Sequence, residues 1–210
     1  MNDKQKESDA IHQHLLEIAP TISDALSKAI STNGPLTLPP APHVPFAAQL
    51  CRTVAGQQLS TKAAQSIWNR VLESAGNAPL LDYVAAAQPD TLRRCGLSDA
   101  KVKTIIGVAQ AAQRGQLDAA DLSQMDSTQR AKQLTALWGI GQWTADMMGI
   151  FYFADADIWP DGDVTARNTL EKLTSKRRKR EKTAAHFAPY RSYLALHMWR
   201  YVDTASSTLA

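Results

Sequence analysis

The sequence predicts an all-helical fold, on three observations. Apolar residues recur at three- and four-residue steps, the spacing that gives a helix one apolar face. The first such series is Ile11, Leu15, Ile18, Ile22, Leu26 and Ile30. Strand signals are scarce, because no alternating stretch of β-branched residues exceeds a few positions. The 210 residues are 44% hydrophobic and 20% charged, which is enough apolar chain to bury the core of one compact module.

Prolines and polar residues divide the first half of the chain into elements. The N-terminal series is interrupted at Pro20, where we expect a helix break or a second start at Thr21. Residues 33–45 hold five prolines and one glycine, which predicts a loop. Helical patterning resumes over 46–54, and the polar segment 55–59 predicts a turn.

Two serines predict the starts of the helices that follow. A serine hydroxyl at such a position accepts a hydrogen bond from a backbone N–H of the first turn. Ser60 precedes one helix, which ends before Gly76 and Pro79, and Ser98 precedes another. The apolar residues of the two helices are Ile67, Val71 and Leu72, and Val102, Ile105, Ile106 and Ala109.

Composition excludes several classes of protein and site. No apolar run is long enough to cross a membrane, and residues 1–10 lack the charged and apolar regions of a secretory signal. Cys51 and Cys95 have no partners at metal-ligand spacing, so we expect no metal held by side chains. We therefore expect the protein to be located in the reducing cytoplasm of a bacterium, associated with the nucleoid. The five histidines show no catalytic or metal spacing and are expected to be structural; they are His12, His14, His43, His186 and His197.

The most informative segment is 134–145, where two helices are expected to meet at a tight hairpin. Their apolar residues are Leu134 and Leu137 in the first helix and Ala145, Met148 and Phe151 in the second. Gly139 and Gly141 allow unusual backbone angles and close approach of a ligand, and Ile140 can fill the gap between the helices. A plain inter-helix turn is one interpretation. The other is phosphate binding by the amides at the helix start.

A turn with two carboxylates follows, Pro160-Asp161-Gly162-Asp163. Asp163 lies where a new helix is expected to begin, so a helix N-cap is one interpretation. Catalysis is the other. A fixed anion can stabilise positive charge that develops in a transition state, for example in a hydrolysis. The same carboxylate can orient or deprotonate the attacking water.

The hairpin followed by this turn resembles the helix-hairpin-helix DNA glycosylases, and G-I-G-x-W-T-A resembles their 3-methyladenine glycosylase II (alkylbase) branch. The resemblance implies that Asp163 is catalytic and that Asp161 has a local role. In bifunctional members a lysine lies two residues beyond the hairpin; here Trp143 does, so no Schiff base can form. The four cysteines of an iron–sulfur cluster are also missing, and both differences imply a monofunctional enzyme. An alkylated, cationic purine leaves readily, so one carboxylate suffices.

Further residues take their expected roles from the same resemblance. Trp143 and Trp199 line the base pocket, where an aromatic ring attracts a cationic purine. Met147 stands where relatives often have an aromatic residue, which changes the pocket. Gln58, in G-Q-Q-L-S, matches the residue inserted into the DNA stack after base flipping. The G-L-S-x-x-K segment, 96–101, leads into a helix behind the active site and is expected to be structural.

The resemblance runs from about Phe46 to Trp199 and also predicts the organisation of the chain. It implies a single, two-lobed, all-α glycosylase module with the active site in the cleft between lobes. One lobe takes about 55–160, including the hairpin at 137–143, and the other takes about 1–54 plus 161–210. The extra N-terminal β domain of some relatives is missing, which makes this a short form.

The implied partner is double-stranded DNA that contains alkylated bases of the 3-methyladenine and 7-methylguanine class, bound by a monomer. The backbone-binding residues are Gly139, Ile140, Gly141 and Thr144. No cofactor is expected apart from a monovalent cation, Na⁺ or K⁺, at the hairpin carbonyls. A non-catalytic helix-hairpin-helix protein that binds DNA or senses damage is the alternative. The basic run 176–180 has three interpretations: a solvated loop, a phosphate-binding patch or a localisation signal.

Overall fold

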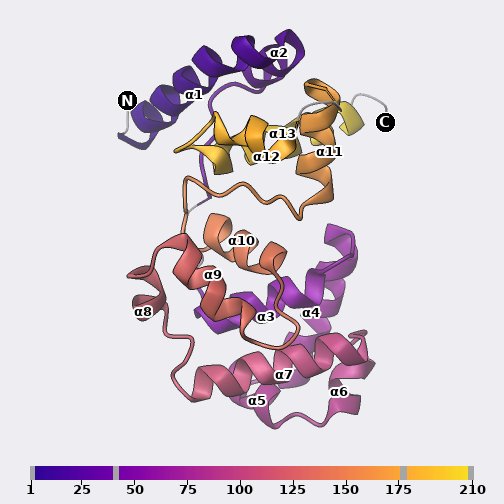
Figure 1. Ribbon diagram of the computed structural model, residues 1–210. Coiled ribbons are helices and arrows are strands. Elements are labelled where there is room, and N and C mark those ends of the chain that lie inside the picture. The colour runs from indigo at the N-terminus through magenta and orange to yellow at the C-terminus, as the bar shows by residue number, and fades with distance from the viewer. Residues whose placement is uncertain (1–2, 40–42, 176–178, 208–210) are drawn as a thin grey trace. The chain divides into compact units, whose positions relative to one another are not determined.

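The computed structural model describes residues 3–39, 43–175 and 179–207, and across these ranges it contains thirteen helices and no strand (Figure 1). The all-helical prediction is therefore confirmed. The chain forms two compact units: a terminal unit, Met1–Pro40 with Gly149–Ala210, and a central unit, Ala41–Met148. These boundaries differ from the predicted lobes over 41–54 and 149–160. The first of these segments belongs to the central unit because its helix packs on helices further along that unit.

The central unit is organised around one helix, α7. Its helices are α3 (Phe46–Gly56), α4 (Thr61–Ala75), α5 (Leu80–Ala86), α6 (Pro89–Arg94), α7 (Asp99–Gln113), α8 (Ala119–Ser123), α9 (Ser127–Thr135) and most of α10 (Gln142–Phe151). Helix α7 packs against α3, α5 and α6. Apolar side chains such as Leu50 and Val54 of α3 and Ile105 and Val108 of α7 are buried in this core. Burial also raises the pKa of the Cys51 thiol to about 12, which keeps it protonated and unreactive.

The two predicted serine caps are confirmed. The Ser60 hydroxyl accepts from the Ala63 amide at 3.3 Å, and the Ser98 hydroxyl accepts from the Lys101 amide at 3.4 Å. The break predicted at Pro20 is wrong by a few residues, since the helix continues to Ile22. A proline so close to a helix end removes little more than one hydrogen bond, and the helix tolerates it.

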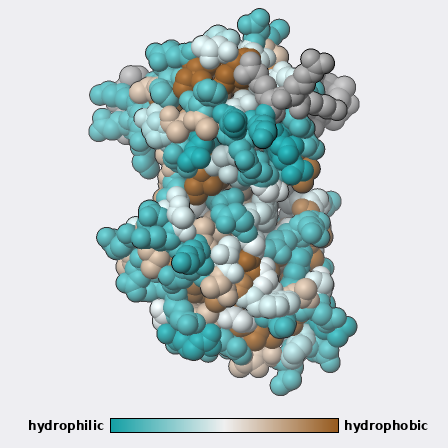
Figure 2. Space-filling model, viewed as in Figure 1, coloured by the Kyte–Doolittle hydropathy of each residue, from teal (hydrophilic) through white to brown (hydrophobic). Residues whose placement is uncertain are grey.

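The terminal unit contains α1 (Asp3–Ile22), α2 (Asp24–Asn33), α11 (Val164–Leu173), α12 (Arg180–Ala185) and α13 (Arg191–Ser207). The predicted apolar series forms its core on the side of α1 and α2, and α11 to α13 supply the other half. The cluster includes Ile11, Leu15, Leu26, Ile30, Leu170, Phe187, Leu194 and Met198, with Ile18 and Ile22 packed at its edge. On the face shown in Figure 2, hydrophobic residues are scattered among hydrophilic ones. None of the described helices is long and apolar enough to cross a membrane.

A histidine pair lies inside the terminal unit. His197 of α13 is 1% exposed, and its Nδ1 lies 3.2 Å from the side-chain nitrogen of Asn33. Its ring centroid lies 5.7 Å from that of His12, which is also buried. Burial, and secondarily the neighbouring His12, lowers the pKa of His197 to about 3. Burial also lowers the pKa of His12, although Asp9 opposes this.

Acid should therefore destabilise the terminal unit well above the pH at which carboxylates titrate. An unfolded histidine has a pKa of about 6.5, so the unfolded chain binds the proton first as the pH falls. The stability from His197 is fully present above pH ~6.5 and is lost toward pH ~3, by up to about 1.4 kcal/mol per pH unit, and His12 contributes in the same direction. Urea unfolding at pH 7 and 5 should show a loss of about 2 kcal/mol from His197 alone.

The matched variants are His197→Gln and His186→Gln, of which the second changes an exposed histidine. We expect His197→Gln to flatten the dependence of the unfolding free energy on pH, and His186→Gln to keep the wild-type slope. Parallel curves for all three proteins would show that His197 is not the acid-sensitive group.

Candidate active site and nucleic-acid interface

Asp163 ends the two-carboxylate turn and caps helix α11. Its Oδ1 accepts a hydrogen bond from the Ala166 amide at 2.8 Å, and its own amide donates to the Pro160 carbonyl at 2.8 Å. The N-cap predicted at this position is thus confirmed. The cap is compatible with the catalytic interpretation, because it fixes the direction in which the carboxylate points.

Trp199 makes a second contact with the same carboxylate oxygen. The indole nitrogen of Trp199, on α13, donates to Asp163 Oδ1 at 3.0 Å, and the Trp199 ring lies 5.6 Å from the Phe151 ring at 31°. A residue expected in the base pocket therefore also orients the candidate catalytic group. With the backbone amide on one side and the indole on another, Oδ1 is held before any ligand arrives, as an electrostatic catalyst requires.

The competing carboxylate has a tryptophan of its own. The indole nitrogen of Trp159 donates to Asp161 Oδ1 at 3.3 Å, and the Asp161 amide donates to the Trp159 carbonyl at 2.9 Å. Both contacts lie within three residues of chain. Asp161 is thus engaged in the turn itself, which agrees with the local role that the resemblance implies.

The loop before this turn is attached to the start of α13, a feature that sequence reasoning missed. Arg191 donates from Nε to Asp157 Oδ1 at 2.6 Å and from its terminal nitrogen to Oδ2 at 2.9 Å. These hydrogen bonds lower the pKa of Asp157. The buried Ser192 hydroxyl accepts from the Ile158 amide at 2.9 Å. The attachment holds the loop to the helix that carries Trp199; its partners are too distant in sequence for any local pattern to reveal them.

The hairpin lies between the end of α9 at Thr135 and the start of α10 at Gln142. Leu137, expected in the first helix, lies instead in the turn, where its carbonyl accepts from the Ile140 amide at 3.1 Å. The helix ends early because the chain must already reverse at this point. Ile140 is 4% exposed, so its side chain is packed inside, as expected of a residue that fills the gap between helices.

The two hairpin glycines have different physical roles. Gly139 has a φ of +79°, and a Cβ there would lie 2.0 Å from Thr104 Oγ1 on α7. Gly141 does not have a positive φ, and a Cβ there would meet no atom within 4 Å. Gly139 is therefore required by the fold, whereas Gly141 leaves open, exposed main chain at the start of α10.

Thr144, expected to bind the DNA backbone, has an internal contact instead of a free surface. It is 1% exposed, and its hydroxyl accepts from the Gln57 side-chain nitrogen at 2.9 Å. Of the four residues expected to contact phosphate, only Gly139 and Gly141 are exposed. The hydrogen bond ties the hairpin helix to the turn that carries Gln58, which is exposed.

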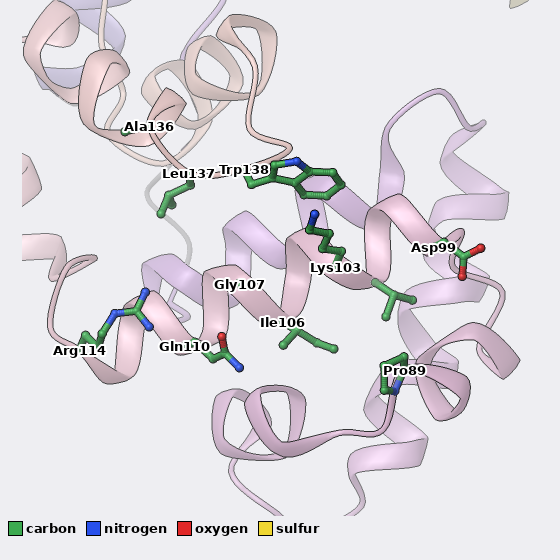
Figure 3. Close-up of a pocket in the computed structure, with 11 residues that line it drawn as sticks. Pro89, Asp99, Lys103, Ile106, Gly107, Gln110, Arg114, Ala136, Leu137 and Trp138 are labelled. Atoms are coloured by element: carbon green, nitrogen blue, oxygen red, sulfur yellow. The ribbon is translucent and has the colours of Figure 1, made fainter.

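An exposed tryptophan precedes the hairpin glycines. Trp138 is 54% exposed, and Lys103 Nζ of α7 lies 4.1 Å from its ring centroid. Figure 3 shows Lys103 reaching from α7 toward this ring, above a cavity of about 510 Å³ that Leu137 and Ile106 also line. The cation–π contact holds the residue before Gly139 against α7.

The remaining predicted residues are distributed over both units. Trp143 and Met147 belong to α10 in the central unit, and Met147 is buried. The base pocket that combines them with Trp199 stays a prediction. Within the basic run, 176–178 lie outside the described residues, and Arg180 pairs with Glu171 at 3.3 Å. No cluster suited to a metal ion occurs among the described side chains.

Comparisons with known proteins agree on one family. The family model of the HhH-GPD superfamily base excision DNA repair proteins matches residues 51–191. The alkylbase DNA glycosidase-like protein of Schizosaccharomyces pombe is 29% identical over 190 residues, which cover 86% of this chain and 89% of that protein. The structure of the 3-methyladenine DNA glycosylase of the same yeast with abasic DNA matches with a TM-score of 0.77 and 25% identity, over 91% of this chain and 95% of that chain. The DNA-3-methyladenine glycosidase of Bacillus halodurans matches with a TM-score of 0.75 and 27% identity, over 92% and 91%.

Proposed function

Because the chain belongs to the HhH-GPD superfamily of base excision DNA repair proteins, we propose that it is a monofunctional DNA glycosylase. Its substrates are alkylated purines of the 3-methyladenine and 7-methylguanine class in duplex DNA. The observation that carries the proposal is Asp163, whose Oδ1 is held by a backbone amide and by the Trp199 indole. The names of the similar glycosylases support the same substrate class.

The reaction needs the damaged nucleotide outside the base stack, because its sugar cannot be reached within the duplex. In the proposed mechanism Gln58 fills the vacated space, and the exposed main chain at Gly139 and Gly141 binds a phosphate oxygen. Trp143, Trp199 and Met147 are the proposed base-binding residues, and the positive charge of the base is attracted to the two indoles.

Asp163 then acts at the sugar. The bond between C1′ and the purine nitrogen breaks, its electron pair leaves with the cationic base, and the Asp163 carboxylate stabilises the positive charge on the deoxyribose. Water adds to C1′ and gives up its proton, for which Asp163 is the acceptor. The products are a free neutral purine and an intact strand with an abasic site. No lysine lies at position 143 to cleave that strand.

A monovalent cation at the hairpin carbonyls, Na⁺ or K⁺, is part of the proposal for the DNA-bound state. The Leu137 carbonyl accepts the Ile140 amide and retains a second lone pair that suits a hard cation. Such an ion would be held by the hairpin carbonyls and would offset the charge of the DNA backbone.

The test is base release from duplex DNA alkylated with a radiolabelled methyl donor, followed by denaturing electrophoresis of the strand. We expect labelled methylpurines in solution and a strand that breaks only after alkali treatment. Cleavage without alkali would contradict monofunctional chemistry. No release, together with retained binding to the DNA, would instead identify a non-catalytic binding or damage-sensing protein.

A further inference from the structure

The segment that carries Gln58 is a type II β-turn. Gln57 has φ −51° and ψ 133°, Gln58 has φ +58°, and the Leu59 amide donates to the Gly56 carbonyl at 3.2 Å. The third residue of such a turn needs a positive φ, which glycine adopts far more easily than glutamine. Without outside help the chain favours the commoner type I turn, in which ψ of the second residue differs by about 150°.

Lys101 supplies that help from α7. Its ammonium donates to the Gln57 carbonyl at 2.7 Å and to the Ala55 carbonyl at 2.9 Å. The Gln57 carbonyl belongs to the central peptide of the turn, the group that reverses its direction between types I and II. An ammonium bonded to this oxygen therefore stabilises type II selectively. The Lys101 side chain is partly buried, and this burial lowers its pKa.

A second contact fixes the same turn to the hairpin helix. The Gln57 side chain donates to the hydroxyl of Thr144, a buried residue of α10. Lys101 and Thr144 thus hold Gln57 through its main chain and its side chain, which leaves the neighbouring Gln58 as the exposed tip. These hydrogen bonds link the turn that carries Gln58 to α7 and to the hairpin helix α10 within the central unit.

We infer that Lys101 is a positioning residue for strand insertion, which acts through the turn to aim Gln58 into the DNA stack. This inference rests on the proposed function and assigns a role to a lysine that sequence reasoning regarded as structural. The inserting residue, Gln58, must enter a stacked duplex. If its turn can flip to type I, less of the DNA-binding free energy is available to unstack the damaged base.

The test compares single-turnover excision of 7-methylguanine opposite cytosine with excision of the same lesion opposite an abasic site, where less unstacking is needed. For Lys101→Met we expect about a tenfold loss on the first duplex and less than about a twofold loss on the second. Lys6→Met, which removes an exposed lysine of α1 that pairs with Asp3 in the terminal unit, should match wild type on both. Lys101→Arg keeps donors for the carbonyls and should recover most of the rate. If Lys101→Met does not fold, Lys101→Gln replaces it with the same expectation.

Equal losses on the two duplexes, or no loss on either, would overturn the inference, whereas an inactive wild-type protein would overturn the proposed function. A double-mutant cycle gives an independent answer. If Lys101 acts through Gln58, Lys101→Met adds less than about a twofold loss in a Gln58→Ala background. A loss that persists in that background would mean that Lys101 acts by another route.

Discussion

Asp163→Asn should lower the rate of base release by about 10³-fold while the protein folds and binds alkylated DNA as before. The loss corresponds to about 4 kcal/mol of transition-state stabilisation, the scale expected when a preorganised charge is removed from a developing cation. Single-turnover release of methylpurines measures the rate, and fluorescence anisotropy with a labelled duplex measures the affinity.

Asparagine removes the negative charge of Asp163 and keeps its hydrogen bonds. Its single side-chain oxygen can still accept from the Ala166 amide and the Trp199 indole, and asparagine caps helices as well as aspartate does. The unfolding free energy should therefore stay within about 0.5 kcal/mol of wild type. Asp161→Asn is the matched control, because Asp161 faces Trp159, and it should retain most of the activity. Comparable losses in the two variants would contradict the assignment of catalysis to Asp163.

Trp199→Phe separates the two roles given to that tryptophan. Phenylalanine keeps an aromatic ring against Phe151 but removes the indole N–H that holds Asp163 Oδ1. If that hydrogen bond orients the carboxylate, we expect about a tenfold lower rate, the equivalent of one hydrogen bond to a charged group. An unchanged rate would leave Trp199 with a packing or pocket role alone.

Local signals in the sequence explain what could be predicted. The apolar series of α1 and α2, the serine caps of α4 and α7 and the Asp163 cap each depend on a few neighbouring residues, and all are present in the structure. Pro20 was misread because a proline disrupts a helix interior far more than its last turn.

Long-range pairs explain what could not be predicted. The bonds between Asp157 and Arg191 and those of Lys101 join residues tens of positions apart, with no periodicity to connect them. The two hairpin glycines look alike in sequence, because only the position of Thr104 on α7 distinguishes the crowded one from the open one. Such roles depend on packing between helices.

Gly139→Ala should lower the unfolding free energy by about 2–5 kcal/mol. The positive φ of Gly139 costs an L-residue about 1–2 kcal/mol, and the overlap of its Cβ with Thr104 Oγ1 adds about 1–3 kcal/mol. The Thr104 hydroxyl cannot easily move away, since it is buried and donates to the Ala100 carbonyl at 2.8 Å. Urea denaturation of the variant and wild type measures the difference.

In the Gly139→Ala background, Thr104→Ala should restore the unfolding free energy that is lost to the steric overlap. The cost of the positive φ should remain, so we expect a coupling free energy of about 1–3 kcal/mol between the two positions. The matched glycine variant, Gly141→Ala, should unfold like wild type, because its new methyl group meets open space. If that space is where a phosphate approaches the main chain, Gly141→Ala should instead weaken binding to duplex DNA by about tenfold, or 1.4 kcal/mol. In that case Gly139 of the hairpin would be required for folding, and Gly141 for binding to DNA. Wild-type affinity in Gly141→Ala would refute the second role, and wild-type stability in Gly139→Ala would refute the first.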